Sequence, residues 1–128
     1  MDRRPPEKLY KLTFENRDGY LYACVEGGID NLEISTQYWR EVAEKCKSAD
    51  AKRVLVVEDL PGGGTVAEMY QVAAELPRMG FYGIKVAFVD RHLDQLELNK
   101  FGEMVAVNRG LHGKVFNNVS DAETWLLG

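Results

Sequence analysis

Alternation of hydrophobic and polar side chains near the start of the chain predicts a β-hairpin. In KLYKLTFEN, residues 8–16, apolar side chains recur at every second position, which is the period of a strand with one buried face. The turn residues NRDG follow, and then the largely apolar run YLYACVEG, residues 20–27. Gly19 supplies the positive φ that a tight turn between two strands needs. The sheet should therefore begin with an antiparallel pair.

Several longer segments have the period of a helix instead. Residues 31–49, 65–76 and 95–110 each place apolar side chains three or four positions apart, so each helix should have one buried face. Pro77 has no backbone N–H to donate and should end or bend the second of these helices. The closing stretch SDAETWLL should form a last helix. The side chains expected to face inward are Ile34, Tyr38, Trp39, Val42, Ala43 and Cys46, then Val66, Met69, Tyr70, Ala73 and Leu76, then Leu98, Phe101, Met104 and Val105, and finally Trp125 and Leu126.

Continuous apolar runs predict the centre of the sheet. RVLVVED, residues 53–59, and IKVAFVD, residues 84–90, lack the alternation of a half-exposed strand, and such runs are typical of parallel strands covered on both faces. A short strand is expected in KVFNN, residues 114–118. Strands that alternate with helices at this spacing predict an α/β fold, with a single mixed, mostly parallel sheet of about five strands, an N-terminal hairpin and about four helices.

Composition and charge place the chain among ordinary globular proteins. It has 128 residues, enough for one domain with a proper core, and 45% of them are hydrophobic. Sixteen basic residues against 20 acidic ones give a net charge of -4, which does not favour nucleic acid or an anionic membrane as a partner. No apolar segment has the length of a membrane span, and MDRRPPEK lacks the apolar region of a secretory signal. We expect a single cytoplasmic domain over 1–128, with residues 1–6 loosely attached.

Candidate catalytic and metal-binding residues are few. Cys24 and Cys46 stand alone, without the spacing of a metal site or a redox pair, so we expect no disulfide, no metal and no cofactor. His92 lies near Asp90 and Asp94, where a carboxylate could orient a general base, but no nucleophile motif accompanies it. The sequence therefore assigns no catalytic residue, and an exposed loop histidine is the preferred interpretation.

The glycine-rich stretch after the first apolar run is the strongest candidate site. Gly62, Gly64 and Ala67 match the pattern G-x-G-x-x-A between a strand and a helix, with Asp90 at the end of the next strand, and this is the outline of a dinucleotide fingerprint. Its position after a hairpin and a helix argues against that interpretation. Glu58 and Asp59 lie just before the loop and would repel phosphates, which is a second argument against it. A Walker loop is excluded because no lysine precedes Thr65.

Helix capping offers a simpler explanation of the same residues. Thr65 with Glu68, and Ser120 with Glu123, each have the spacing of a capping box, in which a hydroxyl and a carboxylate satisfy backbone N–H groups at a helix start. The loop nevertheless lies at the carboxyl ends of the predicted parallel strands, where α/β proteins place their sites. The candidate ligand-binding or partner-binding residues are Pro61, Gly62, Gly63, Gly64 and Thr65.

The C-terminal third resembles a known group of domains. FGEMVAVNRGLHGKVFNNVSDAETWL, residues 101–126, is similar to the end of small bacterial STAS-like proteins, relatives of anti-sigma-factor antagonists whose architecture is akin to lipid-binding CRAL-TRIO domains. The rest of the chain matches in the order of its elements. This resemblance implies a binding or regulatory module rather than an enzyme. It also raises phosphorylation of Thr65, since antagonists carry a phosphorylated serine or threonine there, although the Asp-Ser motif is replaced by LPGGGT.

Aromatic residues between two glycines suggest a further contact. In RMGFYGIK, Met79, Phe81 and Tyr82 lie outside any periodic pattern, and together on the surface they would form a dimer contact or the lip of an apolar pocket. The sequence thus predicts a non-enzymatic STAS-like module that binds a protein partner or a small apolar ligand, with a homodimer as one option. The alternative is a nucleotide- or phospho-ligand-binding domain that uses the loop from Gly62 to Thr65.

Overall fold

The computed structural model describes residues 9–62 and 64–128, and it begins with the expected hairpin. Strands β1 (Tyr10–Arg17) and β2 (Tyr20–Gly27) pair in antiparallel register, from Tyr10 opposite Gly27 to Arg17 opposite Tyr20. Gly19 in the turn has a φ of 87°, which confirms its predicted role. The loose segment expected over residues 1–6 lies outside the described residues, and so does Gly63.

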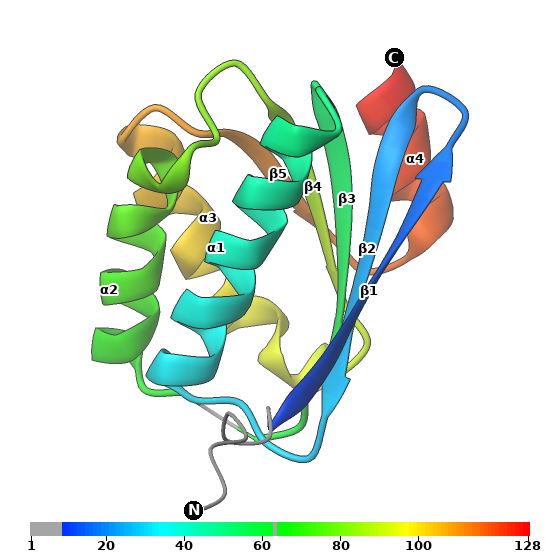
Figure 1. Ribbon diagram of the computed structural model, residues 1–128. Helices are drawn as coiled ribbons and strands as arrows, with labels where there is room; N and C mark the ends of the chain where they lie inside the picture. The colour runs from blue at the N-terminus through cyan, green and yellow to red at the C-terminus, as the bar shows by residue number, and fades with distance from the viewer. Residues whose placement is uncertain (1–8, 63) are drawn as a thin grey trace, which may run out of the picture.

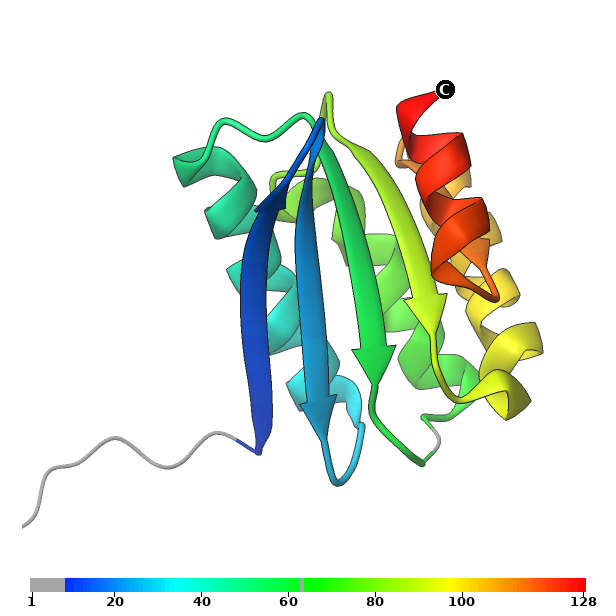
Figure 2. The same ribbon diagram turned by 90° about the vertical axis from the view of Figure 1, so that its right-hand side faces the viewer.

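The remaining three strands extend the sheet in chain order. Strands β3 (Arg53–Asp59), β4 (Lys85–Asp90) and β5 (His112–Phe116) give the order β1-β2-β3-β4-β5, and every pair after the hairpin is parallel. The predicted α/β fold with a five-stranded, mostly parallel sheet is confirmed. Figure 2 shows that strands β2, β3 and β4 end at the same edge of the sheet.

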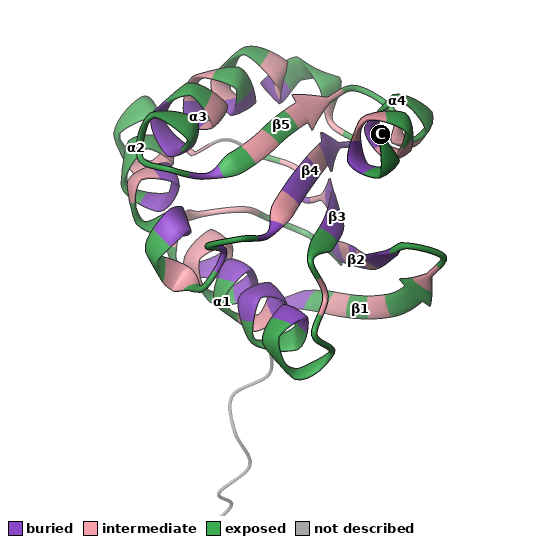
Figure 3. Ribbon diagram, turned by 90° about the horizontal axis from the view of Figure 1, so that it is seen from above, coloured by how far each residue is buried: buried purple, intermediate pink, exposed green. Residues whose placement is uncertain are grey.

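Helices cover the two faces of the sheet unequally. Three helices lie side by side on one face and a single helix covers the other (Figure 1), and Figure 3 shows the buried residues gathered between these layers and the sheet. The larger core cluster lies beneath the three helices and a smaller one lies beneath the single helix. The three helices are α1 (Leu32–Ser48), α2 (Val66–Glu75) and α3 (Leu96–Asn108), and the single helix is α4 (Val119–Leu127).

The inward face of α2 differs from the prediction. Val66 and Tyr70, both expected inside, are 62% and 44% exposed, and Val72, which was not expected inside, is buried. Ala73 and Leu76 are buried as predicted. Both faces have helical spacing, and packing between α1 and α3 selects the one that carries the smaller side chains. Met104 on α3 is likewise exposed, so its expected place in the core was wrong. The stripe predicted for α1, by contrast, is buried throughout.

Helix ends were predicted correctly in part. Thr65 and Glu68 form the expected capping box at the start of α2. The last α-helical residue before Pro77 is Glu75, and a short 3-10 helix (Leu76–Met79) follows. The capping box expected at Ser120 was wrong, because Asn118 caps α4 by accepting from the backbone N–H of Asp121 at 2.8 Å. Asparagine is at least as good an N-cap as serine, and the helix therefore begins earlier.

Candidate ligand-binding site

A cavity of about 100 Å³ lies between the sheet and the three helices α1, α2 and α3. Most of its wall is apolar, and polar side chains are concentrated toward the carboxyl ends of the strands. Apolar lining residues include Trp39, Val72, Ala73, Leu76, Val86 and Phe88. The polar lining residues near the strand ends are Asp30, Ser35, Tyr38, Glu58, Gln95 and Asn99.

Glu58 is the central polar residue of the cavity. Alternation along β3 puts it on the same face as Val54 and Val56, which belong to the core beneath α1, α2 and α3. Its side chain is therefore carried into the protein, and the residue is only 4% exposed. The hydroxyl of Tyr38, from the buried stripe of α1, donates a short hydrogen bond to Oε2 of Glu58. A carboxyl thus ends an otherwise apolar strand face.

Asp30 brings a second carboxyl beside the first. It precedes α1, and its Oδ1 accepts from the hydroxyl of Ser35 at 2.7 Å. Its backbone N–H donates to the carbonyl oxygen of Pro61 at 3.1 Å, which ties this segment to the glycine-rich loop. Burial, followed by the charge of Asp30, raises the pKa of Glu58 well above its usual range. The pKa of Asp30 is raised as well, mainly by burial.

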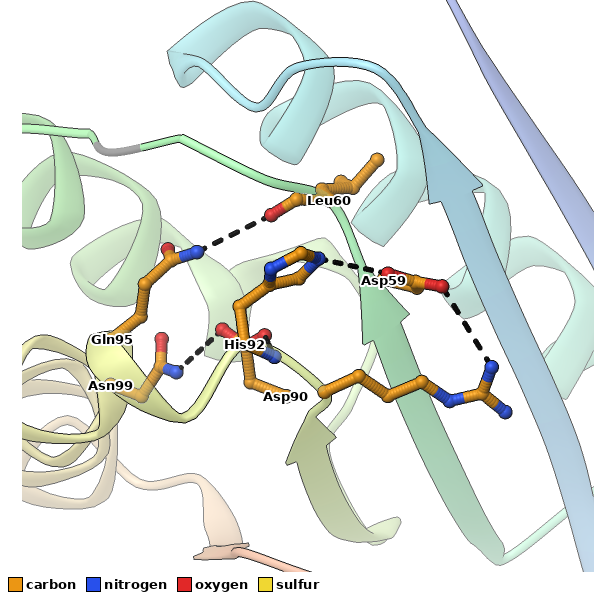
Figure 4. A network of polar contacts seen from close by, with 7 residues as sticks. Asp59, Leu60, Asp90, His92, Gln95 and Asn99 are labelled. Carbon is orange, nitrogen blue, oxygen red and sulfur yellow. Dashed lines mark hydrogen bonds and ion pairs between the residues drawn. The ribbon is translucent and has the colours of Figure 1, made fainter.

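A network of hydrogen bonds fixes the adjacent strand ends (Figure 4). Asp90, at the end of β4, accepts from Nδ2 of Asn99 at 2.8 Å with one oxygen and from the backbone N–H of His92 at 2.8 Å with the other. Gln95 donates to the carbonyl oxygen of Leu60 at 3.3 Å. Burial raises the pKa of Asp90, although the hydrogen bond from Asn99 opposes that rise. The start of α3 is thereby held over the ends of β3 and β4.

His92 is paired on the opposite side of β3 from Glu58. Its Nε2 lies 2.8 Å from Oδ1 of Asp59, and Nη1 of Arg91 lies 3.8 Å from Oδ2 of the same carboxylate. The histidine is half-buried rather than exposed, and its partner is Asp59 rather than Asp94. Within residues 9–62 and 64–128, no hydroxyl or thiol hydrogen-bonds to the imidazole, so the His92–Asp59 pair is not joined to a protein nucleophile in these ranges.

The glycine-rich loop forms part of the rim of the cavity. Gly62 has a φ of 94°, and Gly64 lines the cavity beside Glu68. One oxygen of Glu68 accepts from the backbone N–H of Thr65 at 3.1 Å and the other accepts from the backbone N–H of Leu32 at 3.3 Å. The carboxylate of Glu68 therefore takes one backbone N–H at the start of α2 and one at the start of α1. Gly63, another candidate residue of this loop, lies outside the described part of the chain.

The three residues proposed as an apolar surface contact are separated. Phe81 is 1% exposed, and its ring packs edge-on against Trp39 with centroids 5.7 Å apart. Met79 is half-buried against the core, whereas Tyr82 is 68% exposed. The expected joint surface patch is therefore corrected, because the left-handed Gly80 (φ 118°) reverses the chain and turns Phe81 into the gap between the sheet and α1. Only Tyr82 projects into solvent as an aromatic contact.

The fold and the cavity define the class of this protein. No protein-family model matches the chain, and no curated protein sequence matches it. The residues that the structure describes contain no group of three or more His, Cys, Asp or Glu side chains that could hold a metal ion. None of the helices in those same ranges is long and apolar enough to cross a membrane. The class is a five-stranded α/β domain with a cavity between its sheet and its three-helix layer.

The sequence pointed to the edge of the sheet where the polar lining residues of the cavity lie, but the prediction did not include the carboxyl pair. Glu58 was interpreted as a charge that would repel phosphate, and Asp30 was not singled out. The signal for Glu58 was available in RVLVVED, because strict alternation from Val54 through Val56 points the next residue of that face into the core. The signal for Asp30 was weaker, since its burial depends on how the loop before α1 folds back.

Proposed function

We propose that this domain is a non-enzymatic binding module that holds a small, largely apolar ligand in the cavity between its sheet and helices. The observation that carries the proposal is the cavity itself, which has apolar walls and a few convergent polar groups at one end. This distribution is typical of small-molecule sites, where apolar contact supplies affinity and a few polar groups fix orientation. The resemblance to STAS-like and CRAL-TRIO domains supports binding in preference to catalysis.

The charges at the site favour such a ligand over a nucleotide. A phosphate at the glycine-rich loop would meet the carboxylate of Glu68, which already accepts from the backbone N–H of Thr65, and the carboxyls of Asp30 and Glu58 lie along the same cavity. Like charges in a partly desolvated site repel strongly. A regulatory phosphate on Thr65 would meet the same acids and would have to displace the capping bond from Glu68.

The apolar part of the proposal can be tested by filling the cavity. Ala73 lines the cavity and is buried, so Ala73→Leu should place its added carbons in the space that the ligand needs. Ala67 lies on the exposed side of the same helix, and Ala67→Leu is the matched control. Amide NMR spectra of each protein, recorded with increasing 1-pentanol, report whether an apolar probe enters.

The expected result is a saturable change in the amide signals of cavity residues in the native protein and in Ala67→Leu, and its loss in Ala73→Leu. The protein purified from its host should also show added mass in native mass spectrometry that disappears on denaturation. Absence of any saturable change in the native protein, or the same change in Ala73→Leu, would contradict binding in this cavity.

A further inference from the structure

The carboxyl of Glu58 is bonded to two neighbours at the polar end of the cavity. Tyr38 donates to its Oε2, and the side chains of Glu58 and Asp30 are hydrogen-bonded to each other. A hydrogen bond between two carboxyls requires a proton on one of them. Both residues line the cavity, so this proton-sharing pair faces the space that a ligand would occupy.

The partner of Glu58 in this pair is another acid rather than a base. Asp30 takes one hydrogen bond from Ser35 and one from the shared proton. Two carboxyls in contact cannot both be ionised without a compensating positive charge or a shared proton. With one shared proton the pair keeps one negative charge, and a cationic donor from outside the protein can take the place of that proton.

The rest of the cavity lining supplies no such cation. Glu68 and Glu103 are further acids, and both already accept backbone N–H groups. Lys114 is the one basic residue among the described lining residues. Its ammonium lies 5.5 Å from the centroid of the Phe116 ring, which packs against Trp125 of α4 on the opposite face of the sheet. The field inside the cavity is therefore negative.

We infer that the ligand is a small amphipathic amine whose protonated amino group donates to Glu58 and Asp30 while its carbon chain lies along the apolar wall. This inference rests on the proposed function and adds the chemical class of the ligand. An alkylammonium has three N–H donors and no acceptor, which suits two neighbouring carboxyls. A cavity of 150 Å³ accepts benzene, so the 100 Å³ here fits a chain of about four or five carbons.

Ligands of the same size but different head groups separate this inference from simple apolar binding. An alcohol carries one donor and no charge, and a carboxylate carries a charge of the wrong sign. For chains of equal length, affinity should therefore fall from n-pentylammonium to 1-pentanol to pentanoate. At a pH of about 7.5 an alkylamine is almost fully protonated, because its pKa lies near that of lysine, about 10.4.

The test is a calorimetric titration of the whole chain with these three compounds, repeated for Glu58→Gln, Asp30→Asn and Glu44→Gln. Native protein should bind n-pentylammonium at least about tenfold more tightly than 1-pentanol. Glu58→Gln keeps an acceptor for Tyr38 and should lose most of this preference while still binding 1-pentanol. Asp30→Asn should weaken the preference too, and the exposed control Glu44→Gln should retain it.

The possible outcomes distinguish the two proposals. If native protein binds 1-pentanol and n-pentylammonium equally, the amine inference is overturned and apolar binding stands. Retention of the full preference in both Glu58→Gln and Asp30→Asn would overturn it as well, because the ammonium would then bind elsewhere. If none of the three compounds binds to the native protein, the proposed function fails together with the inference.

Discussion

Replacing Glu58 by glutamine should stabilise the protein at neutral pH. A carboxamide has nearly the shape of a protonated carboxyl, so its oxygen can still accept from Tyr38 and its nitrogen can donate toward Asp30. The native residue is instead an acid whose pKa is raised well above its usual range, by burial first and then by the charge of Asp30. Glutamine therefore keeps the packing and removes the free-energy cost of holding a proton on the carboxyl at a pH above its ordinary pKa.

The effect should grow with pH, as proton counting shows. Between the ordinary glutamate pKa of about 4.3 and the raised pKa in the fold, the folded protein holds a proton that the unfolded chain has lost. The stability contributed by Glu58 is therefore highest below the unfolded pKa and is lost as pH rises through the folded pKa. One proton sets an upper limit of about 1.4 kcal/mol per pH unit, or about 2.7 kcal/mol between pH 5 and pH 7.

Urea unfolding followed by circular dichroism at about pH 5, 6 and 7 measures this difference. The free energy of unfolding of Glu58→Gln minus that of native protein should increase at each step. Asp30, Asp90 and Tyr38 face the same carboxyl and remain in both proteins, so the difference reports Glu58 together with its coupling to them. Glu44→Gln, on the exposed side of α1, should show no such trend. A difference that is constant with pH, or that favours native protein increasingly as pH rises, would refute the reasoning.

Two further predictions concern the fold around the cavity. Phe81→Ala should lower the free energy of unfolding by about 3–5 kcal/mol, because it removes a buried ring that packs against Trp39. Tyr82→Ala, at an exposed site, should change the free energy of unfolding by less than about 0.5 kcal/mol. Equal effects of the two substitutions in urea unfolding would contradict the assigned burial. Thr65→Ala should lower the free energy of unfolding by about 0.5–2 kcal/mol through loss of the capping box. The first backbone amides of α2 should then exchange their hydrogens faster with solvent. An unchanged exchange rate at these amides would argue against the cap.

Much of the fold could be predicted from the sequence because it depends on local pattern. The period of two in the hairpin, the apolar run of β3 and the period of four in α1 each follow from the side chains of one segment. The inward face of α2 was predicted only in part, because it depends on more than the local pattern. Its sequence offers two apolar faces, and the choice between Tyr70 and Val72 depends on the space between α1 and α3, which the segment itself does not encode.

The candidate site depends partly on the topology of the sheet and partly on contacts between separate segments. That a site should lie at the carboxyl ends of the parallel strands follows from topology, and the sequence predicted this edge. The contact between Asp30 and Glu58 depends on the turn before α1 folding onto the end of β3, which Asp30 helps to fix through its bond to Pro61. Such a contact between separate segments cannot be derived from periodicity, although the burial of Glu58 could have been.

Comparison among the acids of this edge explains why Glu58 is the one that points to a ligand. Asp90 receives a donor on each oxygen, from Asn99 and from the backbone of His92, and both oxygens of Glu68 accept backbone N–H groups. These carboxylates are satisfied within the fold and need no further partner. Glu58 is as deeply buried as Asp90, yet besides Tyr38 its partner is another acid, Asp30, with which it must share a proton. A buried group that has to bind a proton in the fold lowers stability at neutral pH, and such a cost is typical of a functional site, where a cationic ligand can replace the proton.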